Sequence, residues 1–116
     1  MTTAPEVAGP RPTRPAWRSL LEERWQERLS TLTELSLAYH DAEPTMTQSP
    51  QLKRLLREAT AARRALYDTE EALARLSGGD FGQCEQCSVL IPAARLLAEP
   101  ETRYCADCVQ AVSWTA

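Results

Sequence analysis

Apolar residues recur at helical spacing along the first long stretch of this chain, which follows Pro15 and runs without Gly or Pro to Pro44. Proline suits a first-turn position, where its fixed φ fits the helix and its missing N–H costs nothing, so the helix should begin near Pro15 and stop before Pro44. Its apolar positions fall at threes and fours on a single stripe, which indicates an amphipathic helix: Leu21, Trp25, Leu29, Leu32, Leu35 and Tyr39.

A second helix is marked at both ends. Ser49 is a good N-cap and Pro50 a good first residue, and the helical pattern continues to Ser77 before Gly78 and Gly79 end it. Spacings of three and four alternate through it without a break, as in a coiled-coil seam. The seam positions are Leu52, Leu55, Ala59, Ala62, Leu66, Thr69, Leu73 and Leu76.

These two helices predict a mainly α fold, in which a long antiparallel coiled-coil helical hairpin precedes a small module with four cysteines (a C4 module). Each helix has about 28 residues, or about 42 Å at 1.5 Å per residue, and a short connection between helices of equal length favours an antiparallel pair. A compact bundle would need breaks inside the helices, and none is visible. Because a two-helix seam is thin, the open end should be anchored where the chain enters the cysteine module at Asp80 and Phe81.

Three segments follow from this pattern. Residues 1–13, rich in proline, are expected to be a disordered N-terminal tail; residues 14–79 form the hairpin, with its tip near 41–49; residues 80–116 form the cysteine module with a short C-terminal helix. A hairpin that satisfies its own seam should be monomeric.

Charge disfavours nucleic acid as a direct ligand. The net charge is −3, and residues 78–116 carry two basic side chains against five acidic ones, so the cysteine module repels phosphate backbones. The chain has no run of about 18 apolar residues and no apolar segment after its first Met that would act as a secretion signal. We therefore expect no membrane association and a cytoplasmic location.

The cysteines form the strongest chemical signal. Cys84 and Cys87 make one Cys-x-x-Cys pair and Cys105 and Cys108 a second, with 17 residues between the pairs, as in zinc ribbons. Four thiolates complete a tetrahedral Zn²⁺ site and leave no position for a reactive water, so the spacing predicts one structural zinc ion. Disulfides or redox chemistry are the alternatives, and the absence of a secretion signal and of a βαβ frame weighs against both.

No active site can be assembled from the remaining residues. His40 is the only histidine and stands near the expected hairpin tip, far along the chain from the cysteines. The sequence has no Ser, His and Asp grouping, no glycine-rich phosphate loop and no helical His-x-x-x-His pair. We therefore expect that the protein is not an enzyme.

Residues 80–108 resemble the zinc finger of the DksA/TraR family, through the segments DFGQCEQC, IP, RLLAEP and CADC. The family also carries a coiled-coil hairpin directly before the finger. Its members are bacterial transcription factors that bind RNA polymerase, insert the hairpin into the secondary channel and alter the stability of open complexes. The resemblance implies that function here, with Arg95 and Leu96 on the surface of the finger.

The hairpin tip departs from the family pattern. The best-studied members present Asp-x-x-Asp-x-Ala, and counting back from Cys84 places these positions at Asp41, Pro44 and Met46. Only Asp41 matches, with Glu43 as a possible stand-in. The partner-binding tip that the resemblance implies comprises Asp41, Glu43, Thr45 and Met46. The alternative is a solvated polar turn with no partner.

A second departure concerns guanosine tetraphosphate. Members that respond to it use basic side chains on the second helix and just past the last cysteine, where this chain has Asp68, Val109 and Gln110. Without those cations we expect poor phosphate recognition. A smaller difference is Ser88, which replaces the usual Gly at a position that often has positive φ.

Two functions from different classes remain. The first is a transcription regulator that binds RNA polymerase and modulates initiation. The second is a zinc-stapled adaptor that keeps the fold, docks on another protein and has no direct effect on transcription. The altered tip is the feature that keeps the adaptor open.

Overall fold

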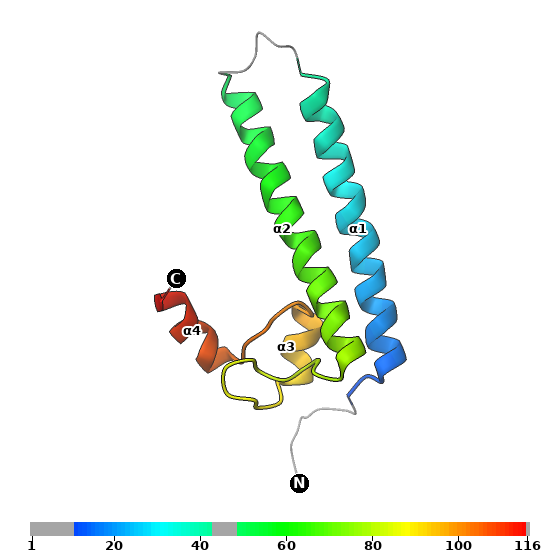
Figure 1. Ribbon diagram of the computed structural model, residues 1–116, viewed down its shortest axis with the longest axis vertical. Helices are drawn as coiled ribbons and strands as arrows, with labels where there is room; N and C mark the ends of the chain where they lie inside the picture. Colours follow the sequence, from blue (N-terminus) through cyan, green and yellow to red (C-terminus); the bar gives the residue numbers. More distant parts are fainter. Residues whose placement is uncertain (1–10, 43–48, 116) are drawn as a thin grey trace.

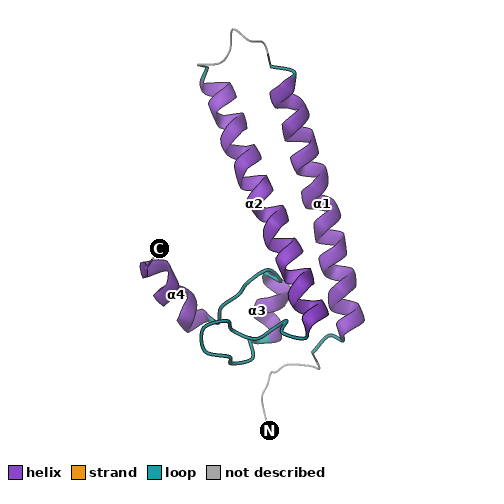
Figure 2. Ribbon diagram, viewed as in Figure 1, coloured by secondary structure: helices purple, strands orange, loops and turns teal. Residues whose placement is uncertain are grey.

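The computed structural model describes residues 11–42 and 49–115, which form four helices in chain order. These are α1 (Arg14–His40), α2 (Pro50–Gly78), α3 (Ala93–Ala98) and α4 (Ala106–Thr115). The helices α1 and α2 run side by side in opposite directions, and α3, α4 and their loops gather at the end where α1 begins (Figures 1 and 2). We call this end the base of the hairpin. In the described part of the chain no helix is long and apolar enough to span a bilayer.

The predicted ends of α2 are confirmed. The Ser49 hydroxyl accepts a hydrogen bond from the Leu52 N–H at 3.1 Å, with Pro50 as the first helical residue. At the other end Gly79 adopts φ = 89°, a left-handed conformation that costs glycine little. The first helix has a cap that the sequence analysis missed, since Thr13 Oγ1 accepts from the Ala16 N–H at 3.3 Å.

Burial along the hairpin decreases from base to tip. Leu21 and Leu76, near the base, are buried, whereas Leu32 and Leu55, further along, are only half-buried. The last position of the predicted stripe, Tyr39, is 40% exposed, so the stripe is not buried as far as the end of α1. Two helices cover each other on one side only, and toward the tip no third element of the described chain adds to that cover.

At the base, one hydrophobic core joins the hairpin to the cysteine module. The rings of Trp17 on α1 and Phe81 in the loop after α2 have centroids 5.1 Å apart. This contact confirms the expected anchoring of the hairpin at its open end. The buried members of the core are Trp17, Leu21, Ala72, Leu76, Cys84, Ile91 and Leu96.

The N-terminal segment contributes to this anchoring. Arg11, within the range predicted to be a disordered tail, donates a hydrogen bond from its guanidinium to the Ile91 carbonyl at 2.9 Å. The Arg11 side chain passes close to Gly82, where an added Cβ would lie 3.1 Å from the guanidinium. The backbone of Gly82 has φ = 90°. Residues before the start of α1 therefore also contact the cysteine module.

Candidate metal centre

The first cysteine pair lies in a tight turn. The Cys84 N–H donates to the Val89 carbonyl, and the Ser88 N–H donates back to the Cys84 carbonyl, both at 2.8 Å. Ser88 closes the turn with φ = 67°, which confirms the positive φ expected at this position although its residue is not glycine. The turn brings Cys84 and Cys87 onto the same side of the chain.

The second cysteine pair lies at the start of α4. Cys105 precedes the helix and Cys108 is in its first turn, where the Val109 N–H donates to the Cys105 carbonyl at 3.0 Å. A backbone hydrogen bond of 2.8 Å from the Glu85 N–H to the Arg103 carbonyl joins the two cysteine segments. Both pairs are therefore presented to one point from a turn and a helix N-terminus.

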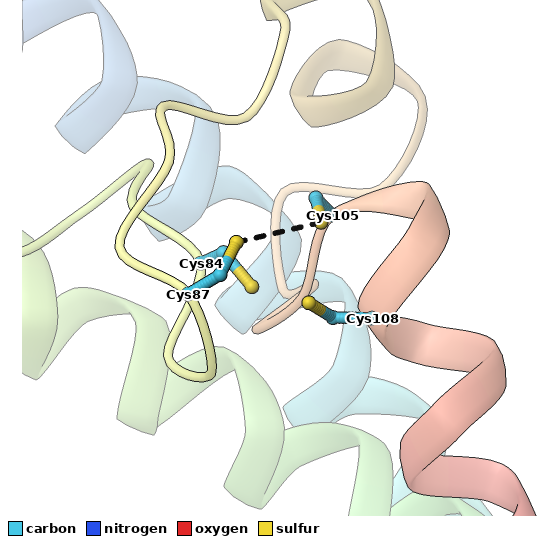
Figure 3. Close-up of side chains that lie close together, drawn as sticks. All are labelled: Cys84, Cys87, Cys105 and Cys108. Atoms are coloured by element: carbon cyan, nitrogen blue, oxygen red, sulfur yellow. Dashed lines mark hydrogen bonds between the residues drawn. The ribbon is translucent and has the colours of Figure 1, made fainter.

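The four sulfur atoms converge (Figure 3). All lie within 4.8 Å of one another, and Cys87 Sγ and Cys105 Sγ are 3.8 Å apart. Four sulfurs at about 2.3 Å from a tetrahedral zinc would be about 3.8 Å from each other, so the sulfur–sulfur distances need to shorten by no more than about 1 Å to bind the ion. This geometry and donor set fit one structural Zn²⁺ held by Cys84, Cys87, Cys105 and Cys108.

The thiols affect one another's protonation. Burial tends to raise the pKa of Cys84, but backbone hydrogen bonds from Cys105, Cys87 and Gln86 outweigh it and lower that pKa to about 6. The pKa of Cys108 moves the other way, because hydrogen bonds with the Cys105 and Cys87 sulfurs raise it. Four sulfurs this close cannot all ionise unless a positive ion neutralises them, as Zn²⁺ would.

A buried carboxylate ties the cysteine module to both long helices. Glu101, 8% exposed, accepts hydrogen bonds from Arg24 Nε and Nη2 on α1, both at 2.7 Å, and from Thr69 Oγ1 on α2 at 2.8 Å. Arg28 Nε lies 3.4 Å from the same carboxylate. Burial tends to raise the pKa of Glu101, but the hydrogen bonds from Arg24 and Thr69 hold it below its ordinary value.

A second group of charges connects the cysteine segments to α2. Glu85, between the first two cysteines, lies 3.4 Å from Arg103 and 3.8 Å from Arg75, and Arg103 lies 3.9 Å from Glu71. Arg75 also donates to the Glu101 carbonyl at 3.3 Å. Burial, together with the charge of Arg103, lowers the pKa of Arg75. The loops that carry the sulfurs are thus held directly against α2.

The two finger-surface residues lie differently from the expectation. Leu96 is fully buried in the core, so its placement on the surface is wrong, and its neighbour Leu97 is the exposed one. Arg95 is half-buried and serves the interior of the module, because it donates to the Tyr104 carbonyl and to Thr102 Oγ1, each at 3.2 Å. A helix of six residues gives too little periodicity for the sequence to show which of two adjacent leucines faces inward.

Of the expected tip residues, the structure describes only Asp41. It is exposed and caps the C-terminal end of α1. The other three, Glu43, Thr45 and Met46, lie outside the described residues. His40 is exposed, with its ring against that of Tyr39, and has no place in the cysteine cluster.

Comparison with known proteins gives a family match and similar relatives. Residues 79–112 match the prokaryotic DksA/TraR C4-type zinc finger. The RNA polymerase-binding transcription factor DksA of Escherichia coli is 28% identical over 93 residues, which are 80% of this chain and 62% of that protein. An uncharacterized protein of Aquifex aeolicus is 35% identical over 95 residues, which are 82% of this chain and 63% of that protein. The chain thus spans less than two thirds of the length of these relatives.

The fold has a match among solved structures. Transcription factor DksA2 from Pseudomonas aeruginosa superposes with a TM-score of 0.76 over 88% of this chain and 84% of that one, at 24% sequence identity. The likeness covers the hairpin as well as the cysteine module, since the module alone is a far smaller share of the chain.

Proposed function

We propose that the protein is a bacterial transcription regulator that binds RNA polymerase, because residues 79–112 match the DksA/TraR C4-type zinc finger and the chain is similar to DksA of Escherichia coli. The observation that carries the proposal is the unit formed by finger and hairpin. Trp17 and Leu21 of the hairpin share one core with Ile91 of the finger. If the finger were only a separate docking module, it would not need contacts with both α1 and α2.

In this proposal the hairpin enters the secondary channel of the polymerase and changes the stability of open complexes. The helices α1 and α2, with 27 and 29 residues, form a rod about 40 Å long that is narrow because only two helices contribute to it. The finger stays at the rim and fixes the direction of the rod through the Glu101 hydrogen bonds. Zinc, when bound, holds the two cysteine segments together, and its four sulfur ligands leave no open position for catalysis.

The proposal assigns the polymerase, and not DNA, as the direct partner. The net charge of −3 and the acidic finger oppose contact with a phosphate backbone. Guanosine tetraphosphate is not expected to act here, because Asp68 occupies the helical position for a cation and already lies 3.4 Å from Arg64. A partner in the transcription machinery also implies a cytoplasmic location.

The test is binding of the zinc-loaded chain to core RNA polymerase, followed by the lifetime of open complexes on one promoter with and without the chain. We expect stable association and a changed lifetime. Association without any change in lifetime would favour passive occupancy of the channel. Absence of association would favour the zinc-stapled adaptor, which docks on a different protein.

A further inference from the structure

The two thirds of α2 nearest the tip carry two parallel rows of exposed side chains. Each row has spacings of four and seven, which keep its members in line at 3.6 residues per turn. Leu56 and Tyr67 are each 51% exposed, and the exposed Thr60 lies between them in the same row. The first row is Lys53, Arg57 and Arg64, and the second is Leu56, Thr60 and Tyr67; together we call them the α2 face.

Charge is distributed unevenly along the molecule, and the cations of the α2 face lie at its positive end. Residues 50–66 contain five basic side chains and one acidic, whereas residues 67–110 contain three basic and eight acidic. The finger end would therefore be repelled by an acidic surface that attracts the distal part of α2.

The cations of the α2 face are available for a partner. Within residues 11–42 and 49–115, neither Lys53 nor Arg57 takes part in an ion pair. Arg64 pairs with Asp68 at 3.4 Å, but its side chain is 77% exposed, and such pairs contribute little. In Figure 1 the finger lies beside the base of α2, and of the described elements only α1 lies beside the part of α2 nearer the tip.

We propose that the α2 face docks on an acidic surface of RNA polymerase and so fixes the rotation of the hairpin about its own axis. This inference rests on the proposed function and adds which side of the rod makes the contact. Residues 29–42, which are the last part of α1 and the two residues after it, carry Glu34 and Asp41 and no Lys or Arg, so the two sides of the rod differ in sign and one rotation is favoured over its opposite. A row of apolar side chains beside a row of cations suits contact with a protein better than contact with a phosphate backbone.

The experiment compares charge reversal on the α2 face with the same reversal elsewhere. Affinity for core RNA polymerase is measured for the wild-type chain, Arg57→Glu and Arg14→Glu, since Arg14 is also exposed on a helix but lies at the base. We expect Arg57→Glu to weaken binding by about tenfold at low salt, with a smaller difference at high salt, and Arg14→Glu to have little effect. Leu56→Ser should weaken binding several-fold more than Leu97→Ser, the matched change at an exposed leucine of the finger.

The outcomes separate this inference from the proposed function. If the wild-type chain binds the polymerase and neither Arg57→Glu nor Leu56→Ser changes the affinity, the inference fails and the proposed function stands. If the wild-type chain does not bind the polymerase, both the inference and the proposed function fail. Arg57→Glu could also leave the affinity for polymerase intact but abolish binding of the chain to duplex DNA, or dissociate a dimer of the chain. The α2 face would then bind nucleic acid or a second copy of the chain, and the inference would fail. Circular dichroism and thermal unfolding show whether each variant is folded.

Discussion

The Arg24 guanidinium donates two parallel hydrogen bonds to the Glu101 carboxylate, both 2.7 Å long, across 77 residues of sequence. Arg24 lies on α1 and Glu101 in the loop between α3 and the second cysteine pair, so this bidentate pair fixes the finger relative to the hairpin. Thr69 on α2 adds a third hydrogen bond to the same carboxylate. One buried side chain therefore joins all three parts of the structure.

Replacing this carboxylate should destabilise the whole protein. We expect Glu101→Gln to lower the free energy of unfolding by about 2 to 3 kcal/mol, because it removes charge-assisted hydrogen bonds and leaves Arg24 and Arg28 without their counter-charge. Urea unfolding followed by circular dichroism measures the loss. Glu99→Gln, an exposed neighbour, is the control and should cost less than about 0.5 kcal/mol. Equal, small losses in the two variants would contradict the role assigned to Glu101.

The same pair predicts a pH dependence with a definite sign. The folded-state pKa of Glu101 lies below that of the unfolded chain, so between the two values the unfolded state binds more protons and stability rises with pH. The stabilisation from Glu101 is complete above about pH 5 and is lost as pH falls through the folded-state pKa. Unfolding curves of wild type and Glu101→Gln should therefore differ at neutral pH and converge in acid. Both proteins share the cysteines, so loss of zinc in acid affects them alike, and a constant difference across the range would contradict the prediction.

Removal of zinc should loosen the finger first. Structural zinc contributes about 10 to 16 kcal/mol to the folding of isolated finger peptides, so chelation or Cys84→Ser should unfold the cysteine segments. The ring of Phe81 would then leave Trp17, 5.1 Å away in the folded protein. Trp17 fluorescence reports this change in a background in which Trp25 and Trp114 are replaced by Phe. Addition of zinc after chelation should restore the signal in the wild-type chain but not in Cys84→Ser, and an unchanged spectrum on chelation would exclude the structural role.

The tip offers a test that separates function from stability. Asp41 is a negative charge at the C-terminal end of α1, where the helix dipole disfavours it, so Asp41→Asn should leave stability unchanged or raise it by about 0.3 to 1 kcal/mol. If Asp41 acts near the catalytic centre, the variant should nevertheless have less effect on open-complex lifetime while its polymerase affinity stays close to that of wild type. Thermal unfolding, affinity and lifetime are measured together, with Glu43→Gln for comparison. Equal lifetimes for all three proteins would assign the tip a passive role.

The elements set by local chemistry could be predicted from the sequence. The cap at Ser49 and the left-handed end at Gly79 depend on residues close in the chain, and the cysteine spacing depends on the fixed geometry of one ion. The positive φ at Ser88 followed from the family resemblance, in which Gly is usual at this position.

The features that were missed depend on contacts between distant segments. Glu101 is a single acidic residue in a loop, and no spacing relates it to Arg24. The contact of Arg11 with Ile91 was hidden in the same way, since prolines around it made the segment resemble a disordered tail. Tyr39 fitted the helical stripe, but periodicity gives the direction of a side chain and not whether another element covers it.

The most direct test of the central claim is a cryo-electron microscopy reconstruction of the zinc-loaded chain bound to core RNA polymerase. The account predicts density for α1 and α2 inside the secondary channel, with the finger at its rim and the side of α2 that carries Arg57 against an acidic surface. Density for the finger on another part of the polymerase, with the hairpin outside the channel, would contradict it.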